Sequence, residues 1–368
     1  MDKRKYGRIV IKVGSNSLAS ASGGINGVVM DSIAYVISKF REQGASCILV
    51  SSGAVASGMG RLSIDKKPND ISSKQALAAV GQGILIEKYS YFFAKYDQIC
   101  AQILLSRIDL GEASHYKNAQ NAIDKLLDMG VVPIINENDT VVVEELCFGD
   151  NDRLSSLVAG MVSADLLVLV TDVDGLYTVN PKRDSSATFI EKVEDIGSVK
   201  GLAEGSGSEV GTGGMVTKIK AAEMAANFGI PTFLTSFKNI ADLSDLMTDN
   251  WPKGTYFSPV NTMLNGEKRW LAYGALTIGQ IIVDDATVSK IENEGKSIIL
   301  SSIVGIEGVW DCNDPIRITD STGCEIARGL AEVGSANILS MMKDPSFASK
   351  EIVNFDNMTV LHGIGGVN

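Results

Sequence analysis

Short apolar segments alternate with longer amphipathic segments along the first two-thirds of the chain, and this alternation limits the folds that the chain can adopt. The apolar segments have the length of β-strands and lie at residues 8–13, 47–50, 99–105, 131–135, 166–170 and 230–234. Between them, apolar residues recur at helical spacing, as at Val29, Ile33, Val36 and Phe40. Strands and helices in this order predict an α/β fold, a three-layer αβα sandwich with a mainly parallel sheet.

Polar residues gather directly after four of the predicted strands. These clusters occupy residues 14–17, 51–53, 136–140 and 171–174. In parallel sheets, ligands bind at the edge where the carboxyl ends of the strands meet. The sequence therefore predicts one binding site, built from loops that are far apart along the chain.

The chain is acidic and carries few features of an exported protein. Its 368 residues include 33 basic and 44 acidic ones, a net charge of −11, which argues against broad binding to nucleic acids or anionic membranes. Its five cysteines are odd in number and form no CxxC pair, so neither a disulfide framework nor a zinc site is indicated. We expect a cytoplasmic protein without a membrane segment.

The pattern changes after about residue 239. Residues 259–274 read as a linker, and short β-rich segments dominate from there on. The segment 320–323 (DSTG) between two of them is a hairpin signal. We therefore predict an α/β domain over residues 1–258, a linker over 259–274 and a small β-domain over 275–356.

Two lysines stand where a phosphate group could be bound. Lys12 ends the first strand beside Gly14, and its ammonium group can act there as a point charge for a phosphate. The segment 212–218 (TGGMVTK) opens a helical pattern, and helix N-termini with glycines bind anions. This segment is not a Walker A loop, because the GxxxxGK[ST] order is absent.

The segment 149–155 (GDNDRLS) places two carboxylates and a carboxamide directly before an apolar stretch. Asp150, Asn151 and Asp152 can hold Mg²⁺, orient the lysines or bind a substrate amine, and the residues alone leave these alternatives open. The set at 136–139 (NEND) adds further polar groups after a strand.

Histidine is scarce, which bears on the reaction type. His115 and His362 are the only two, and neither neighbours a plausible nucleophile. A carboxylate acceptor, with a solution pKa near ~4.3 for glutamate, is ionised at neutral pH and needs no general base. Phosphoryl transfer to a carboxylate therefore fits these residues better than transfer to an alcohol.

Taken together, these motifs resemble the amino acid kinase family and, within it, the kinases of glutamate. The matching segments run in the family's order over roughly residues 8–240, and they are IKVG (11–14), VSSGA (50–54), SKQALAAVGQ (73–82), PIINEND (133–139), GDND (149–152), LVTD (169–172), GLY (175–177) and GTGGM (211–215). The C-terminal part, with RITD (317–320) and IARGL (326–330), resembles a PUA domain, a β-rich pseudo-barrel. Two departures are Asn16, where a hydroxyl residue is commoner, and the turn at 311–314, which replaces an Arg-Gly-Asp-like sequence.

The resemblance implies an activity and partners. It implies ATP-dependent phosphorylation of the γ-carboxylate of L-glutamate to L-glutamyl 5-phosphate, the first step of proline biosynthesis, with proline as feedback inhibitor. It also implies a homo-oligomer, either dimer or tetramer, and glutamyl phosphate reductase as a candidate partner.

The resemblance further implies roles for individual residues. Lys12 and Lys218 would be catalytic and contact the phosphates, and Asp152 would orient them. Ser52, Asp139 and Asn151 would hold glutamate, with Asp139 near its α-amino group. The ATP site would comprise Lys12, Thr171, Asp172, Thr212, Gly213, Gly214, Met215, Val216, Thr217 and Lys218. Mg²⁺ would bridge the β- and γ-phosphates, and no protein ligand to the metal is assigned.

Other functions compete with this one. Kinases of acetylglutamate, aspartate, carbamate or UMP share the fold, and UMP is disfavoured because Arg153 is the only arginine beside the loops. An RNA-binding protein with an inactive kinase half is the alternative from another class. Residues 275–351 carry six basic and twelve acidic residues, so RNA binding by the PUA domain is not expected.

Overall fold

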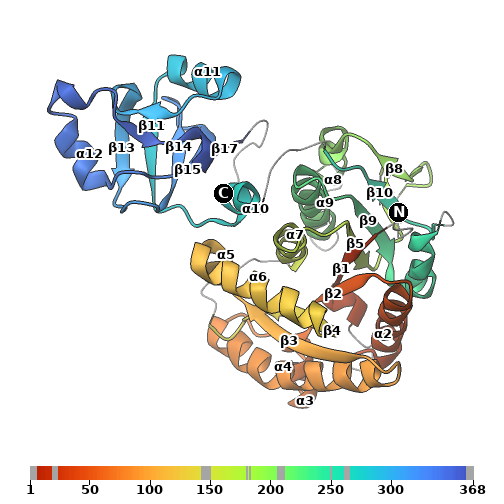
Figure 1. The fold of residues 1–368 in the computed structure, drawn as a ribbon. Helices are drawn as coiled ribbons and strands as arrows, with labels where there is room; N and C mark the ends of the chain where they lie inside the picture. Colours follow the sequence, from red (N-terminus) through yellow and green to blue (C-terminus); the bar gives the residue numbers. More distant parts are fainter. Residues whose placement is uncertain are drawn as a thin grey trace. The chain divides into compact units, whose positions relative to one another are not determined.

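The protein forms two compact units, which Figure 1 shows in a computed structural model. The structure describes residues 6–18, 24–141, 151–179, 181, 184–204, 212–248, 251–260 and 266–361. One unit comprises residues 1–110 and 114–263, and the other comprises residues 111–113 and 264–368.

The first unit is built around an eight-stranded sheet with the order β3-β4-β2-β1-β5-β9-β10-β8. Its strands are β1 (Arg8–Val13), β2 (Ser46–Ser51), β3 (Ile99–Leu105), β4 (Val131–Glu137), β5 (Leu166–Thr171), β8 (Lys192–Val193), β9 (Thr232–Ser236) and β10 (Thr255–Phe257). The six strands from β3 to β9 in this order are all parallel, whereas β10 runs antiparallel to β9. This confirms the mainly parallel sheet that the strand–helix alternation predicts.

Helices cover both faces of this sheet and complete the three layers. They are α1 (Ser15–Leu18), α2 (Gly27–Glu42), α3 (Ala54–Arg61), α4 (Ile71–Ala94), α5 (Arg107–Gly111), α6 (Ala113–Asp128), α7 (Asn151–Met161), α8 (Lys200–Glu204) and α9 (Thr212–Asn227), with 3₁₀ segments η2 (Ile196–Val199) and η3 (Phe237–Met247). A short hairpin, β6 (Leu176–Tyr177) and β7 (Phe189–Ile190), follows β5. Among the helices that the structure describes, none has the length and hydrophobicity needed to cross a bilayer.

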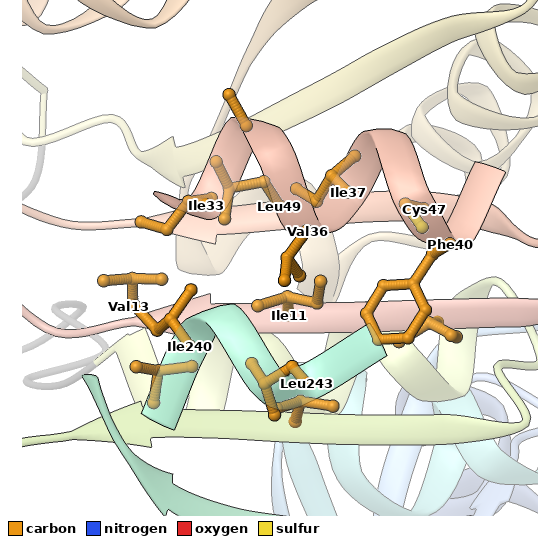
Figure 2. Packing of buried hydrophobic residues seen from close by; sticks show 14 of the residues in the cluster. Ile11, Val13, Ile33, Val36, Ile37, Phe40, Cys47, Leu49, Ile240 and Leu243 are labelled. Atoms are coloured by element: carbon orange, nitrogen blue, oxygen red, sulfur yellow. The ribbon is translucent and has the colours of Figure 1, made fainter. Parts of the chain in front are cut away.

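The core on one face of the sheet shows why Lys12 points to the other. In Figure 2, Ile11 and Val13 of β1 pack with apolar side chains of α2 and η3, among them Val36 and Leu243. Successive side chains of a strand point to opposite faces. Lys12, between Ile11 and Val13, therefore projects to the face covered by α7, whose Asp152 it contacts.

Two glycines, Gly58 of α3 and Gly81 of α4, let these two helices approach each other closely. A Cβ on Gly58 would lie 2.0 Å from the carbonyl oxygen of Leu77, and one on Gly81 would lie 1.8 Å from that of Ala54. Atoms this close must move apart, so neither position accepts a larger residue without shifting a helix.

The second unit is β-rich. Its elements are α10 (Gly266–Arg269), the π-helical turn η4 (Trp270–Gly274), β11 (Gly279–Val283), α11 (Asp285–Glu294), β12 (Ile298–Ile299), η5 (Leu300–Ser302), β13 (Ile303–Gly308), β14 (Pro315–Thr319), β15 (Glu325–Leu330), α12 (Ser335–Met341), η6 (Pro345–Phe347), β16 (Glu351–Val353), η7 (Phe355–Asn357) and β17 (Met358–Val360). A five-stranded sheet has the order β13-β11-β14-β15-β17, and β12 pairs with β16. The hairpin signal holds, since Asp320 Oδ1 accepts hydrogen bonds from the backbone of Thr322 and Cys324 between β14 and β15.

The segment that we predicted as a linker, 259–274, differs from that prediction over residues 266–274. There the chain is helical and belongs to the second unit. Trp270, Leu271 and Tyr273 are buried, so the physical reason is the apolar WLAYG sequence, which gains stability by packing rather than by remaining solvated.

The close packing of α3 and α4 gives a matched pair of stability predictions. Gly81→Ala should lower the free energy of unfolding by about 1–3 kcal/mol, because its methyl group collides with backbone. Gly83→Ala, two residues along the same helix, should raise it by about 0.5–1 kcal/mol, since a Cβ there meets nothing within 4 Å and alanine favours the helix. Urea denaturation of both variants checks this, and equal effects at the two positions would contradict it.

Candidate active site

The carboxyl ends of the central parallel strands bring the predicted loops to one edge of the sheet. In the register of the strands, Val13 at the end of β1 pairs with Ser51 at the end of β2 and with Val170 near the end of β5. The loops that follow these residues therefore start side by side. Because β2 and β5 lie on opposite sides of β1, this is the switch point of the sheet, where ligands of such folds bind.

A buried carboxylate holds two lysines together at this edge. Asp152 is fully buried, and one of its oxygens contacts Lys12 Nζ while the other lies 2.9 Å from Lys218 Nζ. The side chains of Lys12 and Lys218 are only 4% and 12% exposed. Thr217 adds a hydroxyl hydrogen bond of 3.0 Å to the same carboxylate. The three residues predicted as catalytic thus form one cluster.

Two helices place this cluster. Asp152 lies in the first turn of α7, where the helix dipole favours a negative charge. Ser156 of α7 donates a hydrogen bond of 2.9 Å to the carbonyl oxygen of Ala221 on α9, and this contact sets the spacing between the two helices. Lys218 stands one turn before Ala221 and so faces Asp152.

The electrostatics of the cluster favour an anionic ligand. Burial by itself raises the pKa of the Asp152 carboxyl, but the charges of Lys12 and Lys218 and their hydrogen bonds outweigh it and hold the pKa below its usual value. Asp152 therefore stays ionised and neutralises one of the two ammonium groups. Two ammonium groups that share one carboxylate are suited to contact a phosphate.

The predicted substrate residues Ser52 and Asn151 are in direct contact. Asn151 Nδ2 donates to the hydroxyl of Ser52 at 2.8 Å and to the backbone carbonyl of Ser51 at 2.7 Å. The same nitrogen lies 2.9 Å from Asn136 Oδ1, a residue of the NEND set that was not among the predicted ligands. Because Asn151 directly precedes Asp152 on α7, this polar group adjoins the lysine cluster.

Asp139 has an unusual charge environment. Burial and the nearby carboxylate of Glu137 raise the pKa of Asp139 to about 6, and Lys67 opposes the shift. Such a carboxylate gains from the arrival of a cation, and the α-amino group of an amino acid is one. This supports the predicted role of Asp139, which follows the end of β4.

The predicted nucleotide residues lie in two places along the same edge. Thr171 ends β5, is buried, and donates a hydrogen bond of 3.0 Å to Asp172 Oδ1. The other set forms the start of α9 and consists of Thr212, Gly213, Gly214, Met215, Val216, Thr217 and Lys218. Gly149, Asp150 and Gly211 of the predicted motifs lie outside the described residues.

One ion pair near the nucleotide residues was not predicted. Asp174, in the loop after β5, pairs with Lys253, whose ammonium group also lies 5.0 Å from the centre of the Phe189 ring. Tyr177 donates a hydrogen bond of 3.1 Å to Asp174. The sequence around Lys253 indicates only a connector. No short motif therefore predicts that Lys253 pairs with Asp174.

The contacts of Asp152 determine whether this carboxylate could coordinate a metal ion. Asp152 is engaged by two lysines and a hydroxyl, which leaves it unsuited to coordinate a cation. Among the residues that the structure describes, no group of three or more histidine, cysteine and acidic side chains could hold a metal ion. Asp150, the other carboxylate of this motif that could hold Mg²⁺, lies outside the described residues.

Comparison with known proteins identifies the family. Residues 7–236 match the model of the amino acid kinase family. The chain belongs to the amino acid kinase family. It is 50% identical to the glutamate 5-kinase of Desulfitobacterium hafniense over 96% of this chain and 98% of that protein, and 42% identical to the glutamate 5-kinase of Geobacter sulfurreducens over 97% and 98%.

A solved structure is similar in fold to this chain, and a second family model matches its C-terminal part. Carbamate kinase from Giardia lamblia bound to AMP-PNP is similar in structure, with a TM-score of 0.52 and 17% identity over 70% of this chain and all of that one. At this identity the likeness concerns the fold alone. Residues 279–353 match the PUA domain, which confirms the resemblance noted in the sequence.

The environment of Asp139 predicts a pH-dependent cost in stability. Its pKa is higher in the folded protein (about 6) than its ordinary value of 3.8, so the folded state holds the proton more tightly, and stability falls as pH rises from about 4 through 6. Asp139→Asn should therefore raise the free energy of unfolding by about 1–2 kcal/mol at pH 7, a figure reduced for partial exposure.

The gain should shrink as the pH is lowered toward 4.5, which thermal unfolding at several pH values can follow. Asp65→Asn changes the net charge equally at an exposed position and serves as control. A variant of Asp139 that is less stable than the wild type at pH 7 would contradict the argument.

Proposed function

We propose that the protein transfers the γ-phosphoryl group of ATP to the γ-carboxylate of L-glutamate and so forms L-glutamyl 5-phosphate, the first intermediate toward proline. The observation that carries the proposal is the Lys12–Asp152–Lys218 cluster beside the Ser52–Asn151 pair. It puts the charges that phosphoryl transfer needs next to amide and hydroxyl groups suited to an amino acid. Relatives named glutamate 5-kinase match the chain over almost its whole length.

The main barrier to the reaction is the repulsion between two anions, the carboxylate and the phosphate. The positive charges of the two lysines would reduce this repulsion. A carboxylate oxygen attacks the γ-phosphorus, a new O–P bond forms, and the bond from phosphorus to the oxygen bridging to the β-phosphate breaks. Lys12 and Lys218 would neutralise the phosphate oxygens on which charge is spread during transfer. No proton has to be removed from the acceptor, because glutamate's side chain is already ionised at neutral pH.

Asp152 would keep the two ammonium groups in place between turnovers. Without it, two buried like charges would repel each other and move apart. Mg²⁺ bound together with the nucleotide would supply further neutralisation of the phosphate charge. Thr171, Asp172 and the start of α9 would contact the rest of the nucleotide.

The environment of Asp139 favours a free amino acid over the other acceptors used in this fold. Asp139 suits an ammonium group, which carbamate and UMP lack and which acetylation neutralises in acetylglutamate. Aspartate keeps that group and is the closest competitor. We also propose that proline inhibits this activity.

A hydroxylamine assay tests the proposal directly. The purified protein with ATP, Mg²⁺ and glutamate should produce a hydroxamate from the acyl phosphate. It should also release ADP faster with glutamate than with aspartate, carbamate, acetylglutamate or UMP at equal concentration. Titration with proline should reduce the rate. If no glutamate-dependent hydroxamate forms while a known kinase is active under the same conditions, the proposal is wrong.

Lys218→Ala should reduce kcat by about a thousand-fold, because it removes a charge aimed at the transferring group. The fold should survive, since Asp152 keeps its contact with Lys12. Lys220→Ala, which removes an exposed lysine two residues along α9, should leave kcat unchanged. Steady-state rates and thermal unfolding of both variants check this, and near-normal turnover by Lys218→Ala would remove this lysine from the mechanism.

The KM for glutamate should depend on the protonation of Asp139. Since the pKa of this carboxyl is about 6 without substrate, the KM should rise as the pH is lowered from 7 to 5. Asp139→Asn should have a high KM that no longer changes over this range. A wild-type KM that is flat between pH 5 and 7 would show that Asp139 does not bind the amino group.

A further inference from the structure

A chain of hydrogen bonds connects Asn151 with helix α4, outside the residues assigned to the site. Gln82 of α4 accepts a hydrogen bond of 2.9 Å from Asn136 Nδ2 and donates one of 3.2 Å to Gln102 on β3. Asn136 in turn accepts from Asn151 Nδ2 at 2.9 Å. Gln82 is thus two hydrogen bonds away from Asn151.

Backbone groups at two points decide which way these amides face. The N–H of Glu137 can only donate, and it lies 2.9 Å from the Asn136 oxygen, so that oxygen cannot be exchanged with the nitrogen. The carbonyl of Ser51 can only accept, and it lies 2.7 Å from the Asn151 nitrogen. The Asn136 nitrogen must then point to Gln82, and Gln82 must present its oxygen.

The opposite orientation of the Asn136 amide would place donors against donors. Its NH₂ group would then face both the N–H of Glu137 and the NH₂ of Asn151, two pairs of donors without an acceptor. Asn136 is 2% exposed, so water does not readily satisfy these groups. The acceptor on Gln82 is what makes the present orientation complete.

The orientation of Asn151 matters because three acceptors surround its nitrogen: the Ser51 carbonyl, the Ser52 hydroxyl and Asn136 Oδ1. They turn the carboxamide oxygen of Asn151 to the other side of the group. There it can accept a hydrogen bond from an ammonium group. A change in Asn136 would weaken this arrangement without touching the lysine cluster.

We propose that Gln82 is a positioning residue for the acceptor substrate: by accepting from Asn136 Nδ2 it holds Asn136 in the orientation that the Glu137 N–H selects, with Oδ1 against Asn151 Nδ2. Asn136 thereby helps the Ser51 carbonyl to hold the Asn151 amide so that the Asn151 oxygen meets the α-ammonium group of glutamate. The proposal rests on the proposed function. It assigns to α4, whose packing on α3 requires Gly81 next to Gln82, a part in substrate selection.

Three substitutions of Gln82 test the proposal. Gln82→Met keeps length and helix propensity but removes the acceptor, and it should raise the KM for glutamate about ten-fold, as expected for one buried group left unsatisfied. The KM for ATP and kcat at saturating glutamate should change less than about two-fold, because the lysine cluster is untouched. Glu87→Met, at an exposed position of α4, should behave as the wild type.

Two charged variants separate this role from a general electrostatic effect. Gln82→Glu retains an acceptor for Asn136 and should keep a KM near that of the wild type. Gln82→Lys presents only donors and should raise the KM for glutamate at least as much as Gln82→Met. A mere change of local charge predicts the reverse order, since a lysine attracts the anionic substrate and a glutamate repels it.

The outcomes distinguish the two proposals. Wild-type protein that is active on glutamate, combined with an unchanged KM in Gln82→Met and Gln82→Lys, would overturn the role of Gln82 alone. If Gln82→Met fails to fold, the KM values for glutamate of Gln82→Glu and Gln82→Lys test the proposal. A higher KM in Gln82→Glu than in Gln82→Lys would overturn the role of Gln82. Wild-type protein without glutamate-dependent hydroxamate would overturn both proposals.

Discussion

The candidate active site depends on a single buried carboxylate that keeps two ammonium groups together. Removing Lys12, Lys218 and Asp152 from water costs free energy, and only their mutual attraction compensates for it. Two ammonium groups share this one carboxylate, which suits the cluster to binding an anion. A hydrophobic replacement of the three residues could stabilise the fold equally well, which points to function rather than stability as the reason for their presence.

The rest of the first unit holds this cluster in position. The face of β1 opposite Lys12 is anchored in a core formed with α2 and η3, so the strand cannot rotate (Figure 2). On the other face, α7 carries both Asn151 and Asp152. Adjacent residues of one buried helix thus contact Ser52 on one side and the lysines on the other, and their separation is set by the helix itself.

The sequence predicted the parts of the site that lie in short motifs next to strand ends. Lys12, Asp152 and Lys218 could be grouped because parallel strands bring such loops to one edge, and the motifs supplied the expectation of roles. The link from Gln82 to Asn136 could not be foreseen, because it depends on how α4 lies against β4. The pairing of Lys253 with Asp174 could not be predicted either, because 79 residues separate the two in the sequence.

The helical segment at 266–274 illustrates another limit of local patterns. Proline and glycine before it and the change in composition indicated a linker, yet Trp270, Leu271 and Tyr273 are buried. Large aromatic side chains gain stability from any surface that covers them, and that surface is supplied by residues farther along the chain. Whether such a segment is a linker or part of a core is decided by tertiary packing, which short-range periodicity does not contain.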